Sequence, residues 1–300
     1  PGRDIVLLFL PDEEAGGKHG ARWVVDNRPE VLQGVSEGIG EVGGFSFELA
    51  NHKRIYMIET AQKGLAWLRL RASGTAGHGS LIADDNAVTR LARTVTRIGE
   101  HRFPVQLTPS VESFLSAACD AAEIPFDPHD PESALEQLGP FARMIGATLR
   151  HTANPTMLQA GYKNNVIPGE AEAVVDARFL PGLEQDFFEQ FDALLDEGVT
   201  YEAEVQDISL STPFEGELVD KMTAALIAED PDAVPVPYTL SAGTDAKALS
   251  RLDIRCFGFA PLQLPADLDF AALFHGIDER VPVESLEFGV RVLDRFLRTA

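Results

Sequence analysis

The chain has 300 residues, 45% of them hydrophobic, which suits one large domain or two ordinary domains with a sizeable core. Its formal net charge is −22, from 25 basic and 47 acidic residues, and such a field repels phosphate. We therefore expect neither nucleic acid nor an anionic membrane as a partner. No apolar run approaches the roughly 18 residues of a membrane-spanning helix, so a cytoplasmic location is predicted.

The first notable stretch is an apolar run, residues 5–10, that leads into three acids, Asp12, Glu13 and Glu14, and then two glycines. Six apolar residues predict a strand buried on both faces within a parallel sheet. In α/β proteins, ligands bind at the carboxyl ends of such strands. Of two adjacent carboxylates, one can ligate a metal while the other handles a proton. A solvated acidic turn is the alternative interpretation of this stretch taken alone.

The rest of the chain alternates between two kinds of hydrophobic pattern. Apolar residues at helical spacing predict helices over residues 18–27, 85–99, 111–122, 132–149, 187–196, 218–228 and 283–297. Polar–apolar alternation or buried apolar runs predict strands within residues 65–71, 160–178, 200–210 and 254–259. Asp84 or Asp85 is the expected cap of the second helix. In the last helix, the residues expected to face inward are Leu286, Val290, Leu293 and Leu297.

The alternating strands lie in the middle of the chain, and the buried runs lie at both ends. This distribution predicts an α/β protein in which a domain with a mostly parallel sheet, residues 1–61 and 209–300, is interrupted by a smaller α+β domain, residues 62–208. Cys119 and Cys256 are not in a metal-binding spacing, and we expect free thiols rather than a disulfide.

Two groups of side chains have the chemistry of a site. Glu14, Glu37 and His275 are two carboxylates and an imidazole, each at a strand or loop end near glycine, and they suit Zn²⁺ or a similar ion. The Arg178 guanidinium can bind a carboxylate through two parallel hydrogen bonds. An ion pair with Asp176 is the alternative for that arginine.

These residues fall within an ordered series of motifs: Asp12-Glu13-Glu14 with Gly16-Gly17, Ser36-Glu37-Gly38, Gly74 to Ser80 with Asn86, Asn165-Val166-Ile167-Pro168, Asp176-Ala177-Arg178 with Pro181-Gly182, Gly243-Thr244-Asp245, and His275-Gly276 with Asp278-Glu279-Arg280. Across essentially the whole chain, the series resembles the co-catalytic zinc metallopeptidase family that includes aminoacylase, carboxypeptidase G, acetylornithine deacetylase and succinyl-diaminopimelate desuccinylase. Its members bind two Zn²⁺ ions, with cobalt or manganese as possible replacements.

The resemblance implies a role for each matched catalytic residue. Glu13 resembles the general base that deprotonates a metal-bridging water. Glu14 and His275 resemble ligands of one zinc, and Glu37 resembles a ligand of the other. His78 resembles the histidine that enters a partner subunit's site and stabilises the tetrahedral oxyanion.

The resemblance also implies a substrate and an assembly. The groups that would hold the substrate's carboxylate are Asn165, Arg178, Gly243 and Thr244. The interrupted domain would be catalytic and the inserted one would be a lid and dimerisation domain, so a homodimer is expected. The predicted activity is metal-dependent hydrolysis of N-acyl amino acids or small peptides with a free carboxylate. A non-catalytic relative that keeps the fold as a binding or assembly module, or a metal-independent carboxylate-binding protein, are the alternatives.

One departure from the family bears on activity. Family members carry a His-x-Asp motif and a metal-bridging aspartate upstream, and only Asp4 and Asp12 precede Glu13 here. Catalytic zinc uses three protein ligands and an open position. The resemblance therefore implies that an N-terminal portion of the catalytic domain is missing, and we expect weak metal binding and impaired hydrolysis.

Overall fold

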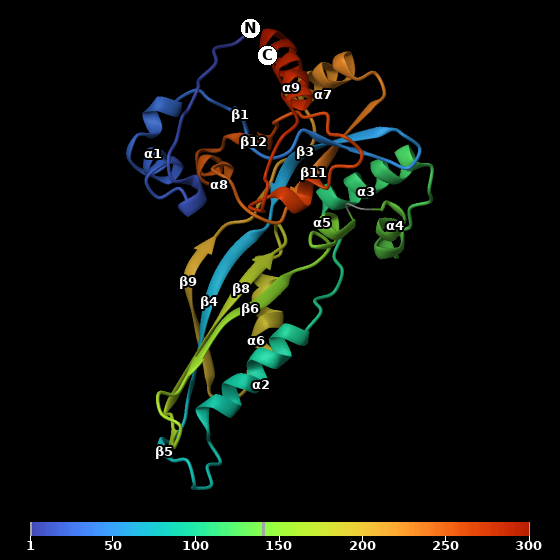
Figure 1. Ribbon diagram of the computed structural model, residues 1–300. Helices are drawn as coiled ribbons and strands as arrows, with labels where there is room; N and C mark the ends of the chain where they lie inside the picture. The colour runs from blue at the N-terminus through green and yellow to red at the C-terminus, as the bar shows by residue number, and fades with distance from the viewer. Residues whose placement is uncertain (1, 140–141, 300) are drawn as a thin grey trace. The chain divides into compact units, whose positions relative to one another are not determined.

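A computed structural model describes residues 2–139 and 142–299, and the chain forms two compact units (Figure 1). Unit 1 comprises Pro1–Gln62, Leu107–Leu149 and Leu210–Ala300, and unit 2 comprises Lys63–Gln106 and Arg150–Ser209. The prediction placed all of residues 62–208 in the inserted domain, whereas residues 107–149 group with unit 1. Within the described residues, no helix is both long and apolar enough to cross a membrane.

Unit 1 is built on a six-stranded sheet with the order β1-β12-β3-β10, in which β2 and β11 also pair with β3. Its strands are β1 (Glu37–Gly40), β2 (Phe45–Glu48), β3 (Arg54–Gln62), β10 (Leu210–Ser211), β11 (Ala233–Leu240) and β12 (Arg255–Gly258). The β1–β12 and β3–β11 pairs are parallel, and the pairs of β3 with β2, β10 and β12 are antiparallel. The α/β class is confirmed, and the sheet is mixed, with its longest pair, β3–β11, parallel.

Helices surround this sheet. They are α1 (Ala21–Asn27), α3 (Pro109–Ala122), α4 (Pro131–Gln137), α5 (Ala142–Gly146), α7 (Glu217–Glu229), α8 (Ala246–Leu249) and α9 (Val283–Thr299), with 3₁₀ turns η1 (Glu13–Ala15), η2 (Pro29–Leu32), η3 (Ser250–Leu252) and η4 (Phe270–Leu273). The single helix predicted over residues 132–149 is two short helices, and residues 140–141 lie outside the described part. Cys119 and Cys256 are buried free thiols.

The closing helix α9 buries a different face from the predicted one. Leu286 and Val290 are 50% and 67% exposed, while Phe288 and Phe296 enter the core with α7. Gly289 lies on the buried face, and a Cβ there would stand 2.3 Å from the Pro261 carbonyl oxygen. Glycine thus allows close backbone approach on the aromatic face. Burying the phenylalanines also removes more apolar area from water than burying Leu286 and Val290 would.

Residues 5–10 are not a strand, and this prediction is wrong for the structure. No strand ladder among the described residues includes them, and Phe9 is 90% exposed. Only Leu10 packs partly against the cluster that joins α1 and α8. An apolar sequence forms a buried strand only where a neighbouring strand completes its hydrogen bonds, and none does so here.

Unit 2 is a four-stranded antiparallel sheet with the order β6-β8-β4-β9. Its strands are β4 (Gly64–Ser73), β6 (Thr152–Ala160), β8 (Glu170–Phe179) and β9 (Val199–Asp207), its helices are α2 (Ala87–Glu100) and α6 (Glu184–Asp192), and β5 (Gly77–His78) pairs separately with β7 (Val166–Ile167). The helix α2 runs along one face of the sheet (Figure 1). Its cap is Asn86, not Asp84 or Asp85: the Asn86 side chain accepts hydrogen bonds from the N–H groups of Val88 and Thr89.

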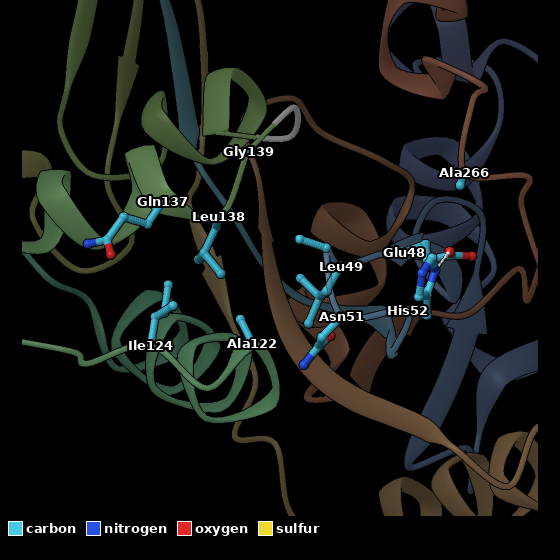
Figure 2. Close-up of a pocket in the computed structure, with 11 residues that line it drawn as sticks. Glu48, Leu49, Asn51, His52, Ala122, Ile124, Gln137, Leu138, Gly139 and Ala266 are labelled. Atoms are coloured by element: carbon cyan, nitrogen blue, oxygen red, sulfur yellow. Dashed lines mark hydrogen bonds and ion pairs between the residues drawn. The ribbon is translucent and has the colours of Figure 1, made fainter.

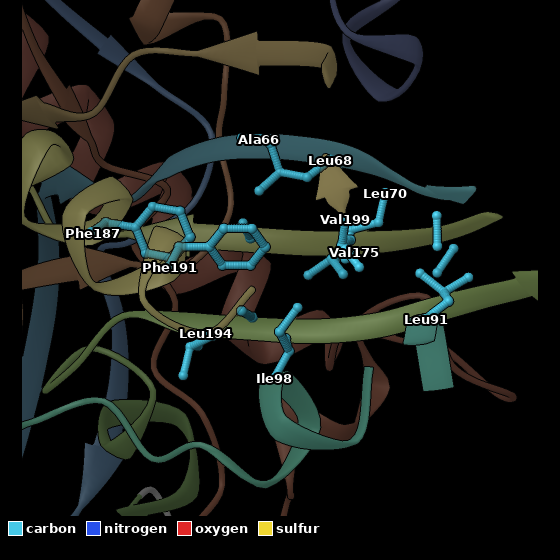
Figure 3. Close-up of a cluster of buried hydrophobic side chains, with 14 of the residues drawn as sticks. Ala66, Leu68, Leu70, Leu91, Ile98, Val175, Phe187, Phe191, Leu194 and Val199 are labelled. Carbon is cyan, nitrogen blue, oxygen red and sulfur yellow. The ribbon is translucent and has the colours of Figure 1, made fainter. Parts of the chain in front are cut away.

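The core of unit 2 explains its alternating sequence. Inward-facing strand residues such as Leu68 and Val175 meet Leu91 and Ile98 of α2 and Phe187 of α6 (Figure 3). The opposite strand face is polar and carries ion pairs, so a one-sided antiparallel sheet forms as the alternation predicts.

Candidate active site

The acidic turn after residue 10 has a backbone fixed by its own hydrogen bonds. Asp12 has a left-handed conformation (φ 74°), and its carbonyl accepts from the Gly17 N–H at 2.7 Å. The Asp12 carboxylate accepts from the His19 N–H at 2.9 Å. The single turn of η1 therefore begins at Glu13 and carries Glu13 and Glu14 side by side.

The structure brings His275 to this turn from the other end of the chain. Its Nε2 lies 3.6 Å from the Glu14 Oε2, and the two side chains are 80% and 77% exposed. His275 also has a left-handed backbone (φ 55°), two residues after the end of η4. Left-handed conformations in non-glycine residues are costly, and here they occur on both segments that carry the predicted chemistry.

Glu13 lies in an unusual electrostatic environment. Burial, followed by the negative charges of Glu41, Glu14 and Asp245, raises the pKa of Glu13 from 4.5 to about 7, and His275 opposes this shift. The pKa values of Glu41 and Asp245 are also raised, mainly by burial. Four carboxyl groups therefore share one region, where a bound cation would relieve their repulsion.

The donors present fit part of a metal site. Glu14 and His275 supply a carboxylate and an imidazole, the oxygen and nitrogen donors that zinc accepts. No group of three His, Cys, Asp or Glu side chains converges with metal-binding geometry among the described residues. The arrangement thus offers two donors for one ion, and a three-ligand site would need further donors.

Glu37, the remaining predicted ligand, is engaged elsewhere. It begins β1 opposite Arg255 of β12 in the parallel register, and its carboxylate lies 3.3 Å from the Arg255 Nη1 and 2.9 Å from the Arg3 Nη1. Of the two acids that flank this strand, the one that acts on Glu13 is Glu41, which follows the strand's carboxyl end. Sequence reasoning missed Glu41, although position after a strand end was an available signal.

His78 and Asn165 come together in unit 2. His78 pairs with Val166 in the β5–β7 ladder, and the Gly79 N–H donates to the Asn165 carbonyl at 2.9 Å. Both side chains are exposed. Two residues predicted to touch substrate thus share one loop pair.

Arg178 is held in the ion pair that was the alternative interpretation. Its Nε and Nη2 donate to the two Asp176 oxygens at 2.6 and 3.0 Å. The Trp67 indole N–H donates to the same carboxylate at 3.2 Å. Two of the five guanidinium N–H groups are therefore directed at Asp176.

The turn that carries Gly243 and Thr244 leads into α8. Gln62, at the end of β3, contacts Thr244 through two hydrogen bonds, and the Lys247 ammonium lies beneath Gly243. A Cβ on Gly17 would stand 3.1 Å from the Asp245 Oδ1, so this turn reaches the acidic segment. Unit 1 thus brings Glu13, Glu14, Asp245 and His275 together. Thr244 directly precedes Asp245 in the chain.

A cavity of about 300 Å³ lies elsewhere in unit 1, between the β2–β3 hairpin and the α3–α4 region (Figure 2). Its lining includes Glu48, His52, Leu49 and Leu138. The Glu48 carboxylate is already paired with His52 at 2.8 Å and with Arg54 at 2.9 Å. The cavity contains none of the predicted site residues, and its charged groups compensate one another.

The chain is similar in sequence to known peptidases and aminoacylases. Residues 60–199 match the family model of a peptidase dimerisation domain. The chain is 24% identical over 321 residues to a probable carboxypeptidase S-like 2 of Dictyostelium discoideum, covering 95% of this chain and 57% of that protein. It is 25% identical over 306 residues to aminoacylase-1 of Sus scrofa, covering 98% of this chain and 63% of that protein.

Solved structures share the fold. An M20 family metallo-carboxypeptidase, Sso-CP2 from Sulfolobus solfataricus, superposes with a TM-score of 0.63 at 14% identity, covering 96% of this chain and 68% of that one. Human carnosine dipeptidase 1 gives a TM-score of 0.61 at 12% identity, covering 96% and 64%. The chain spans about 57–64% of the length of the curated relatives that it matches.

Proposed function

We propose that the chain is a peptidase of the M20 family and acts in metal-dependent hydrolysis of an amide bond in N-acyl amino acids or small peptides, as its similarity to a peptidase dimerisation domain and to aminoacylases supports. The observation that carries this proposal is the approach of His275 to Glu14 at 3.6 Å beside Glu13. This convergence of two distant segments supports a two-donor cation site next to a carboxyl group suited to proton transfer.

Glu13 is the proposed general base. A pKa near neutrality allows a carboxyl group both to take and to return a proton under physiological conditions. Glu13 takes a proton from the attacking water and delivers it to the amine nitrogen that leaves as the C–N bond breaks. A bound divalent cation, Zn²⁺ or in its place cobalt or manganese, would supply Lewis acidity and orient the reactants.

Glu14 and His275 would hold one ion. A second ion would use Glu37, which must first leave Arg3 and Arg255. Since two donors make an incomplete site, we expect these residues alone to bind metal weakly and to support little turnover. Metal binding and hydrolysis are therefore tested at high metal concentration.

Recognition of the substrate's carboxylate is assigned to Asn165, Arg178, Gly243 and Thr244. Arg178 keeps N–H groups beyond the two that bind Asp176, so it can meet an anion without breaking that pair. Unit 1 is proposed as catalytic and unit 2 as the lid and dimerisation domain, supported by the match over residues 60–199. In a homodimer, His78 would donate a hydrogen bond to the oxyanion in the second copy.

The test is hydrolysis of a panel of N-acetyl amino acids and dipeptides by the full chain, with and without added Zn²⁺, Co²⁺ or Mn²⁺. We expect slow, metal-dependent turnover that falls about 100-fold or more in Glu13→Gln, because general-base catalysis contributes at least that factor. Glu100→Gln, at the exposed end of α2, is the matched control. Turnover that survives Glu13→Gln, or that is indifferent to metal, contradicts the proposal. Substrate binding without turnover favours the non-catalytic binding module.

A further inference from the structure

The backbone around His78 is held from both sides. His78 pairs with Val166, and the Gly79 N–H donates to the Asn165 carbonyl at 2.9 Å. The Leu81 N–H then donates to the His78 carbonyl at 3.0 Å, which closes a four-residue turn. Because this turn folds back on itself, Ser80 lies next to the His78 ring.

Ser80 makes two contacts with one ring nitrogen. Its backbone N–H donates to the His78 Nδ1 at 3.3 Å, and its Oγ lies 2.8 Å from the same Nδ1. A backbone N–H can only donate, so Nδ1 must act as an acceptor and carries no proton. In a neutral imidazole the single proton then resides on Nε2.

We propose that Ser80 is the positioning residue of His78, which fixes its Nε2–H tautomer and holds its ring orientation. The exposed Nε2–H is then a ready hydrogen-bond donor to a negatively charged oxygen on a ligand. This inference rests on the proposed function for the identity of that oxygen, the oxyanion formed at the amide carbonyl. The tautomer itself follows from the contacts of this loop alone.

The two contacts of Ser80 have different effects on the His78 ring. A hydroxyl can donate to Nδ1 or accept from it, so the tautomer preference comes from the backbone N–H, and the hydroxyl, 2.8 Å from Nδ1, holds the ring against that N–H. Ser80→Ala removes the hydroxyl and keeps the backbone N–H. Ser80→Thr keeps both, because threonine carries the same Oγ on a backbone that is otherwise unchanged. Ser113→Ala, an exposed serine of α3 in unit 1, is the matched control.

The experiment is a long-range ¹H–¹⁵N correlation spectrum of the histidine rings in the full chain. It is recorded about two pH units above the ordinary histidine pKa of ~6.5, where imidazoles are neutral. The His78 signals are assigned by their loss in His78→Gln. We expect the Nε2–H tautomer to dominate in the wild type. In Ser80→Ala, the ring loses the hydroxyl that holds it against the Ser80 N–H and can rotate away, so the ratio of Nε2–H to Nδ1–H should fall about threefold or more. Ser80→Thr and Ser113→Ala should retain the wild-type ratio.

The kinetic readout separates positioning from folding. With hydrolysis measurable, Ser80→Ala should lower kcat about 3- to 10-fold with KM within about twofold, and Ser80→Thr should restore kcat. A wild-type ring dominated by Nδ1–H, or a ratio unchanged in Ser80→Ala, overturns the inference. If no variant or metal yields hydrolysis while the tautomer shift is observed, the proposed function fails and the positioning role of Ser80 stands.

Discussion

The side chain of Gln62 holds Thr244 through two hydrogen bonds across 182 positions of sequence. The Gln62 Nε2 donates to the Thr244 Oγ1 at 2.7 Å, and its Oε1 accepts from the Thr244 N–H at 3.1 Å. Gln62 is fully buried at the end of β3. The sheet of unit 1 thus fixes the turn that carries both Thr244 and Asp245.

Replacing Gln62 should destabilise unit 1. Gln62→Leu keeps most of the volume but removes two hydrogen bonds to the partly buried Thr244, each worth about 0.5–1.5 kcal/mol. We expect the free energy of unfolding to fall by about 1–3 kcal/mol in urea denaturation. Gln185→Leu, an exposed glutamine of α6, is the control and should change stability by less than about 0.5 kcal/mol. Equal effects at the two sites would refute a role for this hydrogen-bond pair.

The environment of Glu13 should appear as a pH-dependent stability difference in metal-free protein. The pKa of Glu13 is about 7 in the folded chain and 4.5 without the shift, so the folded state binds more protons between these values. Ionisation of Glu13 therefore lowers the stability of the folded chain. This loss of stability is absent below pH 4.5 and complete above pH 7. Glu13→Gln should match the wild type at pH 4 and exceed it at pH 8. Urea denaturation with chelator measures this, and a variant less stable than wild type at pH 8 would contradict it.

Lys63 in unit 2 has a pKa that is lowered rather than raised, and its effect on stability has the opposite sign. Its buried ammonium donates to the Arg150 carbonyl at 2.8 Å, and burial, with the nearby charge of Arg178, lowers the pKa of Lys63 from 10.5 to about 7. The unfolded chain binds more protons between pH 7 and 10.5, so this residue adds stability as pH rises through that window, by up to ~1.4 kcal/mol per pH unit.

Lys63→Met should remove this pH dependence. Between pH 7 and 9.5, the unfolding free energy of the wild type should rise relative to that of Lys63→Met. Lys18→Met, at an exposed position, should show no such trend. Parallel pH profiles for wild type and Lys63→Met would show that the Lys63 amine is not desolvated as the structure indicates.

Local patterns predicted much of the fold because they report on single elements. The alternation in β4 and the spacing in α2 each encode which side faces a core, and both elements form as expected. The face of α9 could not be read, since two apolar stripes compete and only the approach to Pro261 decides between them. The run of residues 5–10 is strand-like in composition, but strand formation depends on partners that the run itself cannot specify.

The candidate site shows the same limit. The motifs located Glu13, Glu14 and His275, and the structure brings these three together. Glu37 and Glu41 flank one short strand, and the position of Glu41 just after its carboxyl end was the signal in the sequence that favoured Glu41. The register of β1 with β12 sets Arg255 beside Glu37, so that pairing is a tertiary property.

The most direct test of the central claim is calorimetric titration of Zn²⁺ into the full chain and into Glu14→Gln and His275→Asn. We predict weak binding of one ion, weakened about tenfold or more by either substitution and unchanged by Glu279→Gln, an exposed acid of the same loop as His275. Binding that is indifferent to Glu14 and His275, or tight binding of two ions, would contradict it.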